Sequence, residues 1–190
     1  GRTAEALHPF QVLVDGIRSL GLLGTDSHTK FVPPQYKIGT REERVELLAG
    51  LIDTDGSYEG GCYDYISKYK QLAEDVAFVA RSLNLAAYVT LCKKTCKNND
   101  KTGTYYHICI SGNLSGIPCR VPHKKAPHRR QKKSVLLTGI KMEPVGIGDY
   151  YGLTLAGEDR RFLLGDFTVV HNTVIAAHIA KEFADRGRIL

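Results

Sequence analysis

Hydrophobic residues recur with helical spacing in three stretches of the chain. In residues 70–84, apolar side chains repeat every three or four positions, which places them on one helical face. Residues 9–21 and 40–55 show the same spacing, and the second of these begins with Thr40 and Glu43 in capping-box positions. The pattern therefore predicts three helices, each with one apolar face.

Between these helices the pattern changes to the alternation typical of strands. Residues 57–67 predict a hairpin that turns at Gly60 and Gly61, and residues 86–92 and 105–111 predict two further strands. From the second helix onward the order is helix, two strands, helix, two strands. This order predicts an α+β fold.

Two other regions are rich in glycine or proline. Residues 21–39 predict a loop, because Pro33 and Pro34 interrupt any regular element there. Residues 135–171 hold short β-type runs separated by glycine-rich turns, which predicts a small β domain or part of one. These runs are residues 135–142, 149–155 and 161–170.

The composition is that of a globular protein. The 190 residues are 43% hydrophobic, and no run approaches the ~18 apolar residues of a membrane span. The N-terminus has neither an apolar signal core nor an initiator Met, so we expect a piece of a longer protein. Five cysteines without a secretion signal indicate reduced thiols. We therefore expect an intracellular, cytoplasmic protein with no membrane partner.

The positive charge is concentrated in residues 120–133. The net charge of the chain is +6, whereas this segment alone carries seven cations and no acid. A concentrated patch indicates a polyanionic partner such as DNA, and the alternative is a solvated loop. The candidate DNA-binding residues are Arg120, Lys124, Lys125, Arg129, Arg130, Lys132 and Lys133.

Residues 48–56, Leu-Ala-Gly-Leu-Ile-Asp-Thr-Asp-Gly, end the second predicted helix in an unusual way. Asp53 and Asp55 lie at the C-terminus of the helix, where the macrodipole is already negative, so they cost stability unless a cation or a donor meets them. Ala49 and Gly50 are small and allow another helix backbone to approach. The stretch predicts a helix–helix interface with a carboxylate at its base.

This string resembles the signature of the LAGLIDADG homing endonucleases, with eight of nine letters identical and Thr54 in place of alanine. The resemblance covers residues 9–115. It implies an αββαββ endonuclease repeat at residues 40–117, preceded by the end of another repeat and a linker at residues 1–39. It also implies that Asp55 is the catalytic ligand of Mg²⁺ and that the sheet lies on double-stranded DNA.

The resemblance further implies a partner for this single copy of the motif. Two motif helices pack together in the family, so the second copy comes from an upstream segment or from another chain, which includes a homodimer. Asp53 is interpreted as structural. A lysine usually completes such a site, and Lys93 and Lys94 are candidates. The alternative class is a DNA-binding module of the same shape that does not cleave, carried within a P-loop helicase.

A second motif, His171-Asn172-Thr173, follows the β-type runs. An Asn side-chain amide can attack its own carbonyl carbon, which forms a succinimide and breaks the following peptide bond. A neighbouring His can polarise that carbonyl or protonate the leaving amine, and a hydroxyl residue after the Asn can hold an ester. The candidate roles are therefore assisting acid for His171, cyclising residue for Asn172 and nucleophile for Thr173.

Residues 149–172 resemble the C-terminal blocks of inteins, which often carry a LAGLIDADG endonuclease. The resemblance implies that residues 135–172 are the C-terminal strands of a Hint-type splicing domain and that residues 118–134 are a basic linker. It implies no cofactor for splicing and requires an N-terminal intein half as partner. Arg160 and Gly152 stand where many inteins have His and Asp, which is expected to slow cyclisation.

Residues 173–190 are then the C-extein. They resemble the helix of a P-loop NTPase after its Gly-Lys, with helicase-like details, and the alternative is an unrelated helix. A structural zinc site is a separate alternative for irregularly spaced candidate ligands. These are Cys92, Cys96, His107, Cys109, Cys119 and His123.

Overall fold

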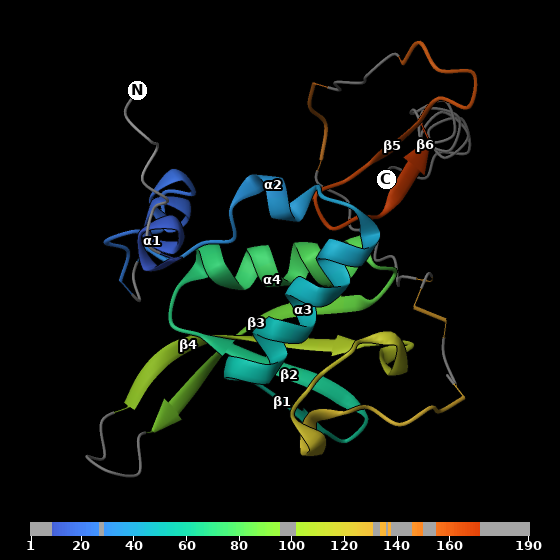
Figure 1. The fold of residues 1–190 in the computed structure, drawn as a ribbon. Helices are drawn as coiled ribbons and strands as arrows, with labels where there is room; N and C mark the ends of the chain where they lie inside the picture. Colours follow the sequence, from blue (N-terminus) through green and yellow to red (C-terminus); the bar gives the residue numbers. More distant parts are fainter. Residues whose placement is uncertain are drawn as a thin grey trace, which may run out of the picture. The chain divides into compact units, whose positions relative to one another are not determined.

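The computed structural model describes residues 9–26, 29–95, 102–130, 134–135, 137, 146–149 and 155–171 (Figure 1). The chain divides into two compact units, residues 1–136 and residues 137–190. Each unit is considered by itself.

The helices of the first unit confirm the three predicted from the sequence. They are α1 (Pro9–Ser19), α3 (Arg41–Asp55) and α4 (Lys70–Ser82). A fourth helix, α2 (Pro34–Lys37), lies in the region predicted as a loop. Its start is compatible with proline, because the first turn of a helix does not use the backbone N–H that proline lacks.

The strands of this unit form one antiparallel sheet with the order β1-β2-β4-β3. The strands are β1 (Gly56–Glu59), β2 (Cys62–Ser67), β3 (Ala86–Thr95) and β4 (Thr102–Ser111). The predicted hairpin is confirmed, and Gly60 and Gly61 both adopt positive φ, at 59° and 83°. A two-residue turn of this kind matches the twist of the flanking strands, and glycine adopts it without steric strain.

The second pair of strands is longer than predicted. Lys93, Lys94 and Thr95 continue β3 and pair with residues 102–104 of β4. The sequence did not indicate this extension, because its side chains are polar. The extended ends of β3 and β4 project into solvent and need no apolar face. The Thr95 and Thr102 hydroxyl groups form a 2.8 Å hydrogen bond across the ladder.

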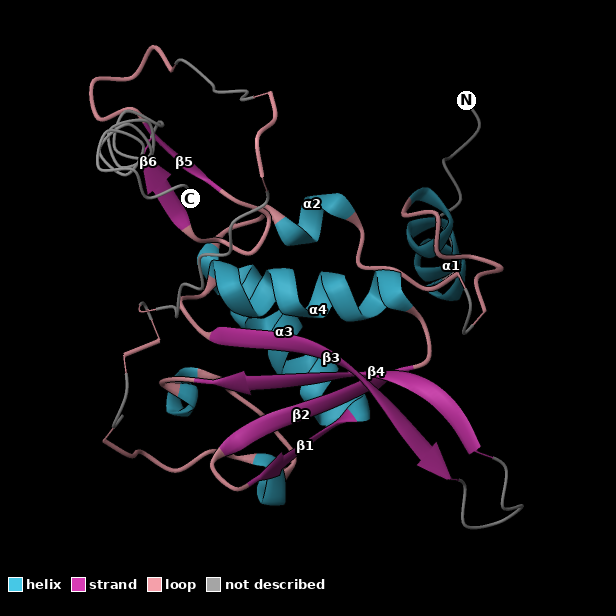
Figure 2. Ribbon diagram, turned by 180° about the vertical axis from the view of Figure 1, so that it is seen from behind, coloured by secondary structure: helices cyan, strands magenta, loops and turns pink. Residues whose placement is uncertain are grey.

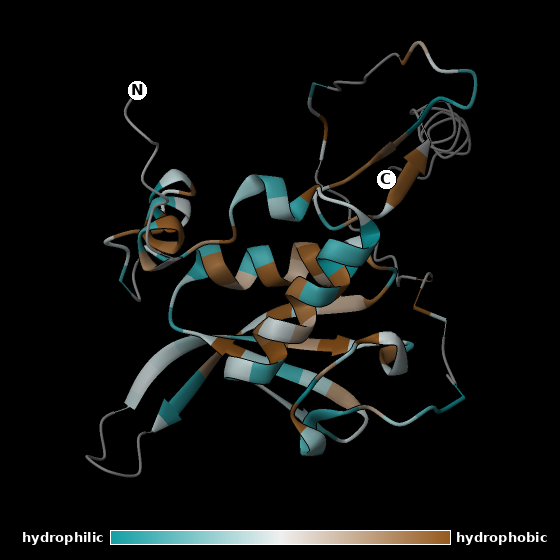
Figure 3. Ribbon diagram, viewed as in Figure 1, coloured by the Kyte–Doolittle hydropathy of each residue, from teal (hydrophilic) through white to brown (hydrophobic). Residues whose placement is uncertain are grey.

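The helices α3 and α4 cover one face of the sheet (Figure 2), and the core lies between these layers. Hydrophobic positions of α3 and α4 gather where the two helices meet each other and the strands (Figure 3). The fully buried large side chains are Leu48, Ile52, Tyr63, Tyr65, Val76, Val79, Ile108 and Ile110. A mixed fold with an antiparallel sheet agrees with the predicted α+β class.

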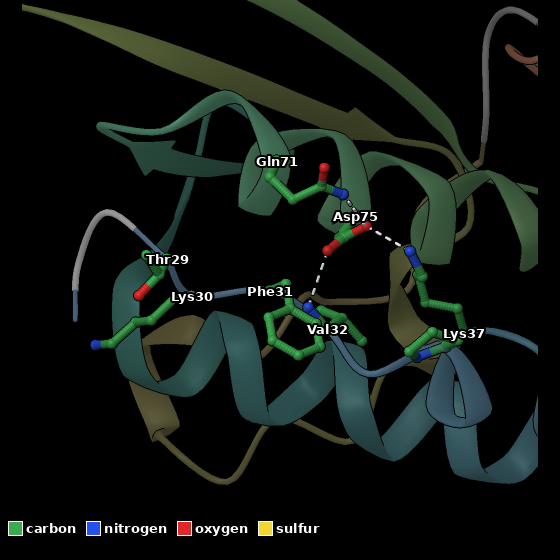
Figure 4. Close-up of a pocket in the computed structure, with 8 residues that line it drawn as sticks. Thr29, Lys30, Phe31, Val32, Lys37, Gln71 and Asp75 are labelled. Carbon is green, nitrogen blue, oxygen red and sulfur yellow. Dashed lines mark hydrogen bonds and ion pairs between the residues drawn. The ribbon is translucent and has the colours of Figure 1, made fainter. Parts of the chain in front are cut away.

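A buried carboxylate attaches residues 29–38 to α4. Asp75 accepts hydrogen bonds from the Val32 amide at 2.9 Å, the Lys37 ammonium at 2.6 Å and the Gln71 side chain at 3.1 Å (Figure 4). These contacts line a pocket of about 490 Å³ together with the side chain of Phe31. The segment that enters α3 is therefore fixed to the body of the unit.

The basic segment also packs on this unit. After β4 the chain forms two short 3₁₀ turns, η1 (Leu114–Gly116) and η2 (Pro122–Lys124). Cys119 is 3% exposed and its thiol donates to the Tyr63 hydroxyl at 3.5 Å. Within the predicted basic linker of residues 118–134, Cys119 belongs to the core and Ala126 packs against it.

The described part of the second unit is a small hairpin. Strands β5 (Arg161–Leu163) and β6 (Val169–His171) pair antiparallel, as expected for the last predicted β run. The turn is closed by two backbone hydrogen bonds: the Leu164 amide donates to the Thr168 carbonyl, and the Phe167 amide donates to the Leu164 carbonyl. Phe167 adopts a positive φ of 68°. The predicted runs 135–142 and 149–155 lie almost wholly outside the described residues. None of the described helices has the length and apolar character required to cross a bilayer.

Candidate active site

The C-terminus of α3 is joined directly to the sheet. The helix begins with the predicted capping box, in which Thr40 and Glu43 bond each other's backbone amides. It ends at Gly56, where a Cβ atom would lie 2.8 Å from the Cα atom of Ile52. A residue without a side chain is therefore needed for the chain to turn from α3 straight into β1. This junction places both acids of the motif where helix meets sheet.

Asp53 is bound by the basic segment. Its carboxylate accepts the Arg120 amide at 2.7 Å and the Val121 amide at 3.1 Å. The hydrogen bond from Arg120 lowers the pKa of Asp53, with smaller contributions from Val121 and from the Lys124 and Arg120 charges, while desolvation opposes them. These contacts give Asp53 the structural role expected from the sequence.

Lys124 supplies the cation that the helix end requires. Its ammonium group donates to the backbone carbonyls of Ile52 and Asp53, each at 2.9 Å, and to that of Thr54 at 3.4 Å. The last carbonyls of this helix, beyond that of Ile52, lack the usual partner one turn further on, and the partial negative charge of this end favours a cation. The side chain of Lys124 is therefore engaged by α3, although its position in a basic run indicated a phosphate contact.

Asp55 lies on the other side of the helix end. It is exposed, whereas the neighbouring Tyr65 is 2% exposed. Burial raises the pKa of Tyr65 to about 12, and the charge of Asp55 and a hydrogen bond to it contribute to the shift. The tyrosine hydroxyl therefore stays protonated near neutral pH and is available as a donor beside the carboxylate. Asp55 is oriented against the sheet and still accessible.

The oxygen donors here fit a hard divalent cation only in part. Mg²⁺ is commonly held by one or two carboxylates together with waters and substrate phosphates. Asp55 can supply one such ligand, and no group of three His, Cys, Asp or Glu side chains suited to a metal occurs among the residues that the structure describes. The remaining ligands must come from the substrate, water or another copy of the motif.

The candidate zinc ligands lie in different parts of the first unit. Cys119 lies in the core against Tyr63, while His107 and Cys109 lie on β4. These candidates do not form a metal-binding group with Cys92 or His123 within the described part of the chain. Cys96 lies outside it.

One side of α3 is open. Leu48, Ala49 and Ile52 pack into the core of their own unit, so Ala49 is not available to a second helix. Gly50 is exposed, and a Cβ atom there would have no atom within 4 Å. A helix backbone can therefore approach Gly50 closely. The sequence predicted such an approach for both Ala49 and Gly50, and the structure leaves it open at Gly50.

The sheet face opposite α3 and α4 carries polar side chains. The Nε2 atom of His107 and the Oδ1 atom of Asp64 lie 2.6 Å apart, and both side chains are half-buried. Burial raises the pKa of Cys109 to about 11, with further contributions from Cys62 and Asp64. The alternating tyrosines of β2 predicted the strand, but the sequence did not indicate the pair of His107 and Asp64.

The candidate catalytic lysines are distant from Asp55. Lys93 and Lys94 lie on β3, and β1 is three strand spacings away, about 14 Å across the sheet. The end of β3 that carries them also extends beyond the level of Asp55. Neither side chain contacts the helix end.

The other basic side chains that the structure describes in this segment are exposed. Arg120 is exposed and pairs with Glu46 at 3.5 Å. Lys125, Arg129 and Arg130 are exposed, and the Arg129 guanidinium lies against the turn at Gly61. Lys132 and Lys133 lie outside the described residues, so for all of these a contact with DNA stays a prediction.

The splicing candidates are only partly described. The backbone of His171 ends β6 opposite Arg161, and Arg160 precedes β5 with a φ of +46°. Asn172, Thr173 and Gly152 lie outside the described residues. The predicted roles of these residues are untested by the geometry.

Comparison with known proteins identifies a family for the residues that contain this helix end and sheet. The homing endonuclease family model matches residues 35–133, just over half of the chain. The chain therefore belongs to the homing endonuclease family. It is also similar to a replicative DNA helicase DnaB from Mycobacterium intracellulare, with 34% identity over 109 residues. That match covers 57% of this chain and 18% of the length of the helicase.

Proposed function

We propose that the chain is part of an intein that interrupts a DnaB-type helicase and carries a LAGLIDADG endonuclease. One pair of findings supports this most strongly: the family match is to a nuclease, whereas the similar curated protein is named a helicase. An endonuclease inserted in a helicase accounts for both. The nonapeptide at residues 48–56 supports the LAGLIDADG subtype.

The proposed reaction is hydrolysis of both strands of a specific DNA site. Bound Mg²⁺ would activate water and stabilise the leaving oxygen of the scissile phosphate. Asp55 would hold the ion, and Tyr65 would fix the direction of its carboxylate. The open side of α3 at Gly50 would receive the second motif helix, which brings the second carboxylate.

DNA would lie on the polar face of the sheet. Lys125, Arg129 and Arg130 are exposed and would bind phosphates, and we assign the same role to Arg120, Lys132 and Lys133. The alternation of side chains along β2 and β4 would present polar groups to base edges.

Cleavage and binding are separated by one experiment. The chain, alone and mixed with an upstream segment that carries a second copy of the motif, is used to select a duplex from a random library, and cleavage of that duplex is measured with Mg²⁺ and with EDTA. We expect binding and Mg²⁺-dependent cleavage. Binding without cleavage would favour the alternative, a DNA-binding module, and absence of both would contradict the proposed nuclease.

Splicing is the second proposed activity. The Asn172 side-chain nitrogen would attack the Asn172 carbonyl carbon, form a succinimide and release the amino group of Thr173. His171 would protonate the departing nitrogen. Joining of the flanking segments needs a complementary N-terminal intein half, in which the acyl group is transferred to the Thr173 hydroxyl before cyclisation.

Mass spectrometry of the chain mixed with an N-terminal intein half tests this activity. We expect release of the segment that begins at Thr173, and we expect Asn172→Ala to stop that release while a branched ester accumulates. Thr173→Ala should prevent joining and still permit cleavage after Asn172. Release from the Asn172→Ala variant at the same bond would contradict the assignment.

A further inference from the structure

One lysine of the basic segment does not face solvent as its neighbours do. The ammonium group of Lys124 has three N–H donors, and three backbone carbonyls of α3 accept from it. No donor is left for a phosphate unless the end of the helix is released. The adjacent Lys125 is exposed.

The same short segment also holds the acid side of the helix end. The Arg120 and Val121 amides donate to the Asp53 carboxylate. Residues 120–124 therefore contact residues 52–54 in two ways: their amides bind a carboxylate, and the Lys124 ammonium group binds backbone carbonyls. Residues 52–54 and residues 120–124 are close to 70 positions apart in the chain. We call these contacts between residues 120–124 and residues 52–54 the clamp. The clamp fixes the position and direction of the last turn of α3.

Asp55 directly follows the clamped residues. Its position depends on the last turn, because the Gly56 amide closes that turn by donating to the Ile52 carbonyl, one of the three that Lys124 binds. Helix ends fray when their carbonyls lack partners. Loss of the clamp would therefore let the Asp55 carboxylate move while the core of the unit stays intact.

We propose that Lys124, together with Asp53, is a positioning residue that sets the place of Asp55 for catalysis, and that Lys124 is not a ligand of DNA phosphate. The proposal rests on the proposed nuclease function. It divides the basic segment into two sets of groups: the Arg120 and Val121 amides with the Lys124 ammonium group hold the helix, and the exposed side chains of Arg120, Lys125, Arg129 and Arg130 bind the substrate.

The test compares Lys124→Met with Lys125→Met in the full chain. Both changes remove one charge at neighbouring positions, so they are matched for net charge. The measurements are hydrogen exchange at the Gly56 amide, the salt dependence of DNA binding and the cleavage rate at saturating DNA. Lys124→Arg is a third variant that retains a cation at the helix end.

For Lys124→Met we expect exchange at Gly56 to quicken about tenfold, as for loss of one charge-assisted hydrogen bond, with the salt slope unchanged. Cleavage at saturating DNA should fall, and Lys124→Arg should restore part of it. For Lys125→Met we expect the salt slope to fall by about 0.9 and exchange at Gly56 to stay unchanged.

Three results would overturn the proposal. The first is unchanged exchange at Gly56 in Lys124→Met, and the second is a reduced salt slope in that variant. A third result, faster exchange with full cleavage, would make Lys124 merely structural and would also overturn it. If the unmodified chain binds DNA but never cleaves it, the nuclease function fails, while exchange at Gly56 still reports whether the clamp exists.

Discussion

The two sides of the α3 C-terminus hold the same type of residue in different surroundings. Asp53 accepts hydrogen bonds from two backbone amides of the basic segment, whereas Asp55 is exposed and lies beside a buried tyrosine. Two positions along a helix are about 200° of rotation apart, so consecutive acids of the motif meet different neighbours. The role of each carboxylate is therefore set by what it contacts, and the signature alone does not separate them.

The largest expected effect is on cleavage and concerns the exposed acid. Asp55→Asn removes the charge that would hold Mg²⁺, while its neighbours in the core are unchanged. We expect DNA cleavage to fall by at least about 100-fold, with binding of the selected duplex retained. A time course of cleavage at saturating DNA measures this, and a loss of less than threefold would remove Asp55 from the proposed site.

The second prediction contrasts the buried and open sides of α3. Ile52 is fully buried, so Ile52→Ala should lower the free energy of unfolding by about 2–5 kcal/mol. Gly50→Ala should instead raise it by up to about 1 kcal/mol, because the new methyl group meets open space in a helix. Urea titration gives both values, and a large loss of stability in Gly50→Ala would mean that this side of α3 is closed.

The third prediction concerns how the contribution of Asp53 to stability depends on pH. The pKa of Asp53 is lower in the folded chain than its ordinary value of 3.8. Its contribution to stability is therefore present above pH 3.8 and is lost as the pH falls through the folded value. The stability difference between the wild type and Asp53→Asn should shrink over that window in urea titrations. A constant difference would contradict the role given to the two amides.

The smallest effect is expected from the exposed cations. Arg129→Gln and Arg130→Gln should each reduce the slope of log binding constant against log salt concentration by about 0.9, with little change in thermal stability. Fluorescence anisotropy with a labelled duplex at several salt concentrations measures the slope. An unaltered slope in the double variant would make this part of the segment a solvated surface.

Much of the fold was predictable from local patterns. The capping box at Thr40, the Gly60-Gly61 turn and the apolar period of residues 70–84 each specify a structure within a few neighbouring residues, and all three are confirmed. The need for a cation or donor at the end of α3 was also predictable from the helix dipole. The short helix α2 was missed, because its two prolines favour a loop in any local interpretation.

The partners of the site were not predictable, because they come from distant parts of the chain. Lys124 and the Arg120 amide reach α3 across close to 70 residues, and nothing in a basic run distinguishes a lysine that caps a helix from one that binds phosphate. Tyr65 was recognised only as a strand residue. Lys93 and Lys94 were candidates for the catalytic lysine, yet the order of strands places them away from Asp55.

The most direct test of the difference between the two acids is where a divalent cation binds. Mn²⁺ can replace Mg²⁺ at oxygen sites and broadens the NMR signals of nearby amides. In a titration of the full chain with Mn²⁺, we predict broadening centred on the amides of Asp55 and Gly56. This broadening should disappear in Asp55→Asn and persist in Asp53→Asn. Broadening that persists in Asp55→Asn, or that requires Asp53, would contradict the central claim.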